Sequence, residues 1–398
     1  MLKLLGRGIV LCALLMAAGM SVAQPSAAAQ AATSHFTTSK CGFTLGAGIV
    51  AGRDVRCGYL TVPENRAHPV RSIRIAVAIF TSVDAHRASD PLIFLQGGPG
   101  GAIVADVGAA ITAKNRAAIV GDHDLILVDQ RGTGLSQPPL SCPEVNTQQL
   151  ALLNQDLTPQ KSAALYETAM AKCHTRLVHQ GIDLSGYTTY NNAADVHDLI
   201  LALGYPAVDI YGVSYGTRVA LEIERSFPQH VRSVILDSSV PTQLRLQPSV
   251  ASARTRVYAT LFAGCQANAN CNKKYPNLQG TFTALVARLN THPLQVAVKD
   301  TTNKSYKVLF KGADLYDFVW QVFYVSPFIK YIPDVIHQVS TGDTRLLGEL
   351  FSILGFDTST NLGVYYSVEC AEGLPYTSPS EVTQADMVYP AAVRTANT

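Results

Sequence analysis

The chain has 398 residues, of which 47% are hydrophobic and 15% charged, and its formal net charge is +2. This composition is typical of a globular protein long enough for one large domain with an insertion, and it excludes a low-complexity chain. The nearly balanced charge, with no basic stripe and no Cys/His finger, gives no support to nucleic-acid binding.

The N-terminus has the pattern of a secretory signal peptide. Two basic residues precede an apolar run over residues 9–20, and small residues follow up to Ala23. The pattern predicts cleavage after Ala23, so that residues 1–23 are removed. The alternative is a membrane anchor, but the run is shorter than the roughly 20 residues of a spanning helix. We therefore expect a secreted or periplasmic protein with no stable membrane span, in which residues 24–40 form a flexible linker.

The cysteines fit an exported protein, because disulfides form in that environment. Proximity along the chain suggests three pairs: Cys41 with Cys57, Cys142 with Cys173, and Cys265 with Cys271. Sequence alone does not fix connectivity. Cys370 is left over, as a free thiol or as a residue whose partner is lost. No histidine stands at a zinc-site offset, so we expect no metal and no cofactor.

Residues 41–240 have the pattern of an α/β core. Short apolar runs bounded by turn residues predict strands at 58–62, 73–80, 92–95, 125–128, 208–211 and 231–236. Helical spacing over 192–203 ends at Gly204, and a second helix is expected from residue 215 to Phe227. Strands that alternate with helices predict a mostly parallel sheet covered on both faces.

The pattern changes after Pro241. Helical spacing dominates at 250–262, 282–289, 315–323, 332–339 and 346–354, and only 294–310 has a strand-like pattern. We interpret residues 241–362 as a mainly helical lid inserted into the core, with a return to the core over 363–398.

The most informative motif is Gly-Val-Ser-Tyr-Gly at residues 212–216. It lies between a predicted strand and a predicted helix, which is the context of a nucleophile elbow with Ser214 at its apex. Gly212 and Gly216 leave room for the sharp turn. The alternative is an ordinary strand-to-helix turn with an incidental serine.

Two further loops follow predicted strands. The glycines of Gln96-Gly-Gly-Pro-Gly-Gly101 allow backbone N–H groups to approach a substrate oxygen, and we expect an oxyanion hole made by Tyr215 with Gly97 or Gly98. A phosphate loop is excluded, because no Lys-Ser/Thr follows and Pro99 removes a donor. In the loop from Asp129 to Ser136, we expect Asp129 and Arg131 to pair.

The loop 96–101, the loop 129–136 and the motif at 212–216 follow one another along the chain in this order. Together they resemble the proline iminopeptidase and tripeptidyl aminopeptidase branch of the α/β-hydrolases. Residues 189–195 and 367–372 are also similar, and the resemblance spans residues 40–375. Proline iminopeptidases usually have His where this chain has Gln96, whereas secreted tripeptidyl aminopeptidase-like members tolerate that change. The resemblance implies an α/β-hydrolase fold with a helical lid. It also implies release of short peptides from a free N-terminus through an acyl-enzyme at Ser214, although some members act as carboxylesterases.

The resemblance implies that the triad acid and histidine lie on loops after the lid. After Ser214 the chain has only His230, His292 and His337, and the sole Asp after the lid is Asp386. The family's C-terminal segment also carries a cysteine that could pair with Cys370. We therefore expect the C-terminal strands and catalytic loops to be absent, and we assign no complete triad. Hydrolysis is expected to be orders of magnitude below that of an intact relative.

Glu369 and Glu372 are candidates for binding a substrate ammonium, since an aminopeptidase needs a carboxylate for that group. The alternative is a structural pair. Three functions stay open: a serine aminopeptidase that acts on short peptides, a secreted carboxylesterase that acts on esters, and a non-catalytic binding protein on the same scaffold.

Overall fold

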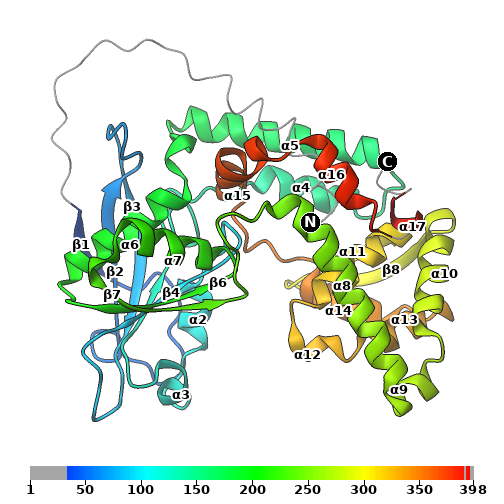
Figure 1. Cartoon of the computed structure of the whole chain (residues 1–398), viewed down its shortest axis with the longest axis horizontal. Coiled ribbons are helices and arrows are strands. Elements are labelled where there is room, and N and C mark those ends of the chain that lie inside the picture. Colours follow the sequence, from blue (N-terminus) through cyan, green and yellow to red (C-terminus); the bar gives the residue numbers. More distant parts are fainter. Residues whose placement is uncertain (1–33, 390, 395–398) are drawn as a thin grey trace.

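This computed structural model describes residues 34–389 and 391–394 (Figure 1). The predicted signal peptide and residues 24–33 of the predicted linker lie outside the described residues. The rest of that linker is not a tether: His35–Ser39 form strand β1, which pairs antiparallel with β2, Val55–Pro63. The pattern missed β1 because this edge strand is mostly exposed and lacks an apolar face.

The core is a seven-stranded mixed sheet in the order β1-β2-β3-β5-β4-β6-β7. The strands after β2 are β3 (Ser72–Phe80), β4 (Leu92–Leu95), β5 (Leu125–Val128), β6 (Val208–Val213) and β7 (Val231–Asp237). All six strands predicted from the sequence are present. β5, β4, β6 and β7 run parallel, and β1, β2 and β3 complete the sheet by antiparallel pairing.

Helices cover both faces of this sheet, which confirms the predicted α/β fold. α6 (Thr189–Leu203) and α7 (Tyr215–Ser226) lie side by side on one face, and α2 (Val104–Ala110) packs on the other (Figure 1). All four residues of β5 are buried, and they alternate between the two apolar cores. A parallel strand buried on both faces gives such a continuous apolar run. α3 is a short helix, Arg116–Val120.

A helical hairpin that the strand pattern did not predict follows β5. It consists of α4, Pro143–Leu152, and α5, Pro159–His179. A disulfide between Cys142 and Cys173 ties the two helices together. The loop between them reaches the lid, where Leu309 N–H donates to the Leu153 carbonyl at 2.7 Å. The short η1 turn, Leu184–Gly186, precedes α6.

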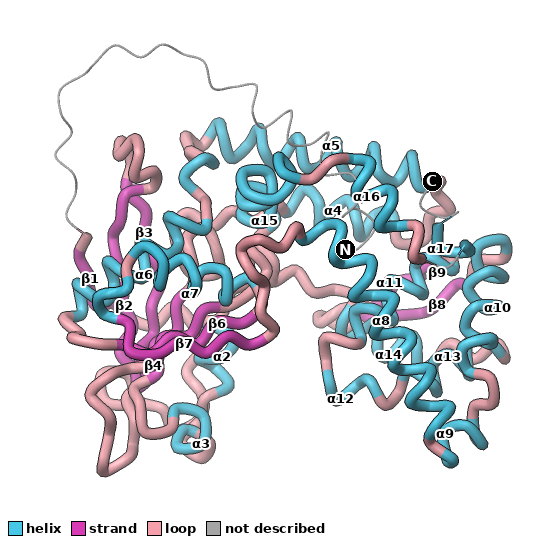
Figure 2. Tube along the Cα trace, viewed as in Figure 1, coloured by secondary structure: helices cyan, strands magenta, loops and turns pink. Residues whose placement is uncertain are grey.

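The lid is a second body with its own apolar core, mainly helical with one β-hairpin (Figure 2). Its elements are α8 (Leu246–Ala267), α9 (Ala269–Lys274), α10 (Leu278–Thr291), β8 (Leu294–Lys299), β9 (Ser305–Phe310), α11 (Gly312–Val322), α12 (Ser326–Ile329), α13 (Ile332–Ser340) and α14 (Arg345–Leu354). The predicted lid helices and the strand-like region are all present.

The predicted return to the core over 363–398 is only partly right. α15 (Leu362–Val368), the π-turn η3 (Glu369–Gly373) and η4 (Leu374–Tyr376) pack into the main core. The chain then leaves it. α16, Pro379–Asp386, lies against α8, and α17, Ala391–Arg394, lies against α10 and α11. Buried Tyr389 and Val393 belong to the lid core, so this segment covers the lid.

β7 is an edge of the sheet and pairs only with β6 among the described residues. Ile235 and Leu236 point to opposite faces of β7, and 47% and 37% of their surfaces are exposed. Parallel strands are normally covered on both faces, so this edge differs from the buried strands beside it.

The structure forms the three predicted disulfides, Cys41–Cys57, Cys142–Cys173 and Cys265–Cys271. Cys370 is buried and disulfide-bonded, so the expectation that it is a free thiol or has lost its partner is wrong, and the described part of the chain contains no free cysteine. Among the described residues, no helix is both long enough and apolar enough to span a bilayer.

Candidate active site

Ser214 stands in the sharp turn between β6 and α7. Its backbone has φ 53° and ψ −119°, a conformation that side-chain-bearing residues rarely adopt and that marks a strained functional turn. The Ser214 N–H donates to the Asp237 carbonyl at the end of β7, at 2.9 Å, and Thr217 N–H donates to the Ser214 carbonyl at 2.9 Å. The turn is thus held from the neighbouring strand and from the helix that follows it.

The glycines on either side of Ser214 are required by close packing. A Cβ at Gly216 would lie 2.1 Å from the Leu95 carbonyl oxygen, and one at Gly212 would lie 2.5 Å from the Gly216 carbonyl oxygen. A side chain at Gly216 would push the elbow away from β4, and one at Gly212 would clash with the first turn of α7. The geometry is therefore that of a nucleophile elbow, as the motif predicts.

The loop after β4 lies directly against the elbow. A Cβ at Gly97 would lie 2.8 Å from Ser214 Cβ and 3.3 Å from Ser214 Oγ. Tyr215 is the first residue of α7, where a backbone N–H has no acceptor within the helix. Two candidate oxyanion donors, on Gly97 and Tyr215, therefore flank the serine, while Gly98 is exposed at φ +125°.

One contact in this loop was not predicted. The Gly97 N–H donates to the side-chain oxygen of Gln96 at 2.8 Å. The Gln96 amide oxygen thus occupies the donor that a substrate oxygen would need. The sequence shows Gln96, but only the side-chain conformation reveals this competition.

Buried polar groups support the loop from behind. Gln130 donates to the Gln96 carbonyl at 2.7 Å, and both the backbone and side chain of Asn361 donate to the Gly100 carbonyl. Asp129 accepts from the backbone N–H groups of Ile103, Val104 and Leu135. Burial raises the pKa of the Asp129 carboxyl, while these three donors oppose that rise.

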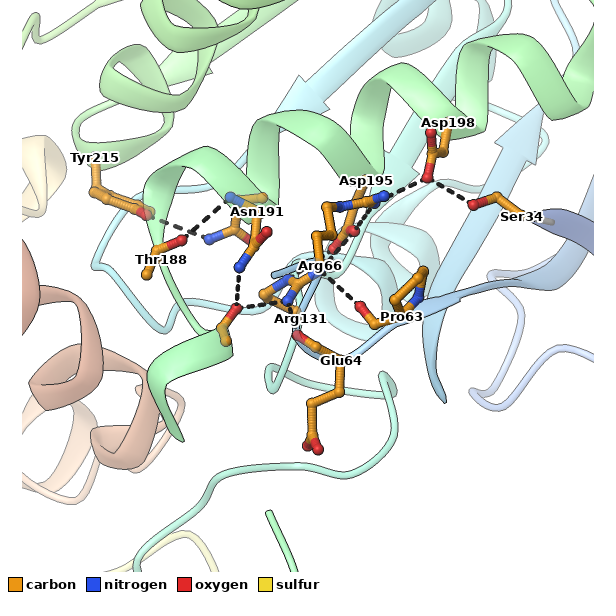
Figure 3. A network of polar contacts seen from close by, with 12 residues as sticks. Ser34, Pro63, Glu64, Arg66, Arg131, Thr188, Asn191, Asp195, Asp198 and Tyr215 are labelled. Atoms are coloured by element: carbon orange, nitrogen blue, oxygen red, sulfur yellow. Dashed lines mark hydrogen bonds and ion pairs between the residues drawn. The ribbon is translucent and has the colours of Figure 1, made fainter. Parts of the chain in front are cut away.

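The predicted pairing of Asp129 with Arg131 is wrong. Arg131 is fully buried and instead forms a two-bond ion pair with Asp195 of α6, at 2.7 and 2.9 Å (Figure 3). It also donates to the carbonyls of Glu64 and Gly186. The Asp129 carboxylate instead accepts hydrogen bonds from backbone N–H groups, so Asp129 and Arg131 contact different parts of the protein.

No histidine contacts Ser214. Its hydroxyl has no hydrogen-bond partner among the described residues, which include all the histidines of the chain. His230 bonds to the Pro206 carbonyl at the start of β7, His292 to Thr291, and His337 packs against Tyr275 in the lid. His230 lies directly before β7, whereas the elbow lies beside the last residue of that strand. Because β7 has seven residues, its two ends are about 20 Å apart.

Glu369 and Glu372 lie in the π-turn η3, close to the elbow but in different states. Glu372 accepts from both the backbone N–H and the hydroxyl of Thr189, whose hydroxyl contacts the Tyr215 hydroxyl at 2.9 Å. Glu369 is 3% exposed, and its Oε2 has no hydrogen-bond partner. Burial raises the pKa of both carboxyls, while the Arg218 guanidinium nearby opposes the rise.

One group of metal-binding type occurs in the described part of the chain, formed by Asp90, His123 and Asp209. Arg232 pairs with both carboxylates, so a cation already stands there. The group lies near the amino ends of β4, β6 and β7, away from Ser214, and we assign it no ligand.

Comparisons with known proteins agree with this geometry. The family model described as "alpha/beta hydrolase fold" matches residues 90–307. A tripeptidyl aminopeptidase of Streptomyces coelicolor is 29% identical over 342 residues, which cover 80% of this chain and 60% of that protein. The serine protease Hip1 of Mycobacterium tuberculosis is 28% identical over 222 residues, covering 54% of this chain and 42% of that protein.

Among solved structures, the proline iminopeptidase of Mycobacterium smegmatis has a TM-score of 0.31 at 20% identity, covering 58% of this chain and 60% of that one. The chain spans about 60% of the length of the tripeptidyl aminopeptidase that it matches.

Proposed function

This chain belongs to the α/β-hydrolase fold family, and from that premise we propose that it is a serine hydrolase of the aminopeptidase type. Ser214 would attack the carbonyl carbon of the peptide or ester bond to be cleaved and form an acyl-enzyme. The observation that carries the proposal is the position of Ser214 at φ 53°, with the backbone of Gly97 packed against it.

The oxyanion hole can stabilise a developing negative charge without a histidine. The serine hydroxyl, however, attacks a carbonyl only inefficiently when no base is present. A serine hydroxyl is almost fully protonated at neutral pH and needs a base to become a strong nucleophile. We infer that no histidine of this chain acts as that base, since His230, His292 and His337 all have other partners and none of them reaches Ser214. Loss of one triad member costs most of the acceleration, because the members act as a unit.

Exogenous imidazole tests this inference, since it can supply the missing base in solution. We expect hydrolysis of a tripeptidyl p-nitroanilide to be similar for the wild type and Ser214→Ala in plain buffer. Imidazole should produce a saturable increase for the wild type alone. Ser239→Ala, an exposed serine after β7, is the matched control and should behave as wild type. Fast turnover without imidazole that Ser214→Ala abolishes would refute the missing base.

The buried carboxylate of Glu369 favours aminopeptidase over esterase activity. One oxygen of the Glu369 carboxyl, Oε2, has no hydrogen-bond partner, and a buried carboxyl of raised pKa ionises when an ammonium group approaches it, because the charge pair stabilises the anion. Glu372 is already occupied by Thr189, so we assign the substrate amine to Glu369 and a bracing role to Glu372.

The preference for free-amine over N-acetylated substrates separates the two roles. With imidazole present, Glu369→Gln should abolish this preference, while Glu372→Gln should lower both rates and leave their ratio unchanged. A ratio unaffected by Glu369→Gln would favour the carboxylesterase alternative.

A further inference from the structure

A cavity of about 400 Å³ lies between the α4–α5 hairpin and the lid. Its walls are α4 with the segment up to Leu157, the adjacent turns of α5, the turn between β8 and β9, the end of β9 with α11, and the end of α14 with residues 355–358. A volume of this size falls in the range of roughly 300–1,000 Å³ found for small-ligand sites. Neither Ser214 nor the loop 96–101 lines it, so it is separate from the elbow.

Amide side chains line this cavity from opposite walls. Gln148 and Gln149 come from α4, and Gln321 comes from α11. All three are half-buried, and none has a hydrogen-bond partner within the described part of the chain. Each amide offers both donors and an acceptor. A peptide group offers the same pair, so a bound peptide would satisfy these side chains.

The charges of the cavity disfavour an anionic ligand. Four aspartates line it, at positions 300, 314, 317 and 357, against the single cation of Lys311. That ammonium is already engaged, because it pairs with Asp156 and donates to the Leu157 carbonyl at 2.8 Å. Asp317 in turn pairs with Arg254 at 2.9 Å. The remaining field is acidic, which suits a neutral or positively charged ligand.

The rest of the wall is apolar and aromatic. Among its members are Phe310, Phe318, Phe351, Leu354 and Phe356. A purely aliphatic ligand would fill this wall but would leave the glutamine amides desolvated without partners, which is unfavourable. A peptide with apolar side chains matches both parts of the lining.

We propose that this cavity is a binding site for a short peptide, neutral or positively charged, that carries apolar side chains. The site holds the peptide backbone through Gln148, Gln149 and Gln321 and the side chains against the lid aromatics. It goes beyond the proposed function, because binding here involves no chemistry at Ser214.

Calorimetry with the full chain carrying Ser214→Ala tests the proposal without turnover. The probe is N-acetyl-Leu-Lys-Leu amide, whose blocked amine removes a reason to bind Glu369. We expect saturable binding that Gln149→Leu and Gln321→Leu each weaken about 5-fold, the effect of one lost hydrogen bond.

Ser162→Trp, which fills the cavity from α5, should weaken binding at least about 10-fold, since the bulky side chain takes the ligand's volume. Ala164→Trp is the matched control, since residue 164 is exposed on the same helix and does not line the cavity. Absence of binding, equal binding by Ser162→Trp and Ala164→Trp, or tighter binding of decanoate than of the peptide would overturn the proposal. None of these results would affect the imidazole test of Ser214.

Discussion

Replacing Arg131 with Met should destabilise the protein strongly, because it breaks the buried ion pair that joins the loop after β5 to α6. Arg131 is fully buried and Asp195 is 3% exposed. Breaking such a pair leaves a buried charge without full compensation and typically costs about 3–5 kcal/mol. Asp195 keeps one partner, Arg66 at 2.7 Å, so we expect a loss near the lower end, about 3 kcal/mol.

Urea unfolding followed by far-UV circular dichroism measures this loss. Arg176→Met is the control, because Arg176 pairs with Glu144 at 2.6 Å with about a third of its side chain exposed. That change should cost no more than about 1 kcal/mol, as exposed pairs contribute little. A loss for Arg131→Met that matches the control would refute the structural role of this network.

The other predictions concern the elbow and the carboxyls beside it. Gly216→Ala should lower the free energy of unfolding by about 1–3 kcal/mol, because the added Cβ would clash with the Leu95 carbonyl oxygen. Gly264→Ala on α8 meets nothing within 4 Å and should stabilise by about 0.5–1 kcal/mol in the same unfolding assay, and equal effects would contradict the packing. Gln96→Ala should free the Gly97 N–H, a hydrogen bond of about 0.5–1.5 kcal/mol, and speed imidazole-dependent acylation about 2- to 10-fold. An unchanged rate would show that Gln96 does not compete. The raised pKa of Glu369 means that the folded state binds more protons than the unfolded state just above the ordinary value of 4.5, so the unfolding free energy should fall as pH rises through this range. Glu369→Gln should flatten that part of the pH–stability profile, and an unaltered slope would assign it to other groups.

The core was predictable because its signals are local. Each buried strand, such as Leu125–Val128, is a continuous apolar run, and the elbow glycines sit where strand and helix patterns meet. The disulfides followed from proximity along the chain. Strand β1 escaped because an exposed edge strand carries no apolar alternation.

The remaining features depend on contacts between distant residues. Arg131 and Asp195 are 64 positions apart, so nothing local favoured this pair over Asp129. The C-terminal segment packs on the lid through only a few apolar side chains, among them Tyr389. So few residues give no helical or strand periodicity in the sequence from which this packing could be predicted. The different states of Glu369 and Glu372 depend on Thr189, which donates to Glu372 and has no hydrogen bond with Glu369.

The most direct test of the central claim is to locate the adduct formed by a fluorophosphonate probe, with and without imidazole, by intact-mass and peptide mass spectrometry. The account predicts one adduct on Ser214 that forms much faster with imidazole and is absent from Ser214→Ala. Rapid labelling of Ser214 without imidazole would contradict the missing base, and labelling elsewhere, or none under either condition, would contradict the role of Ser214 as the nucleophile.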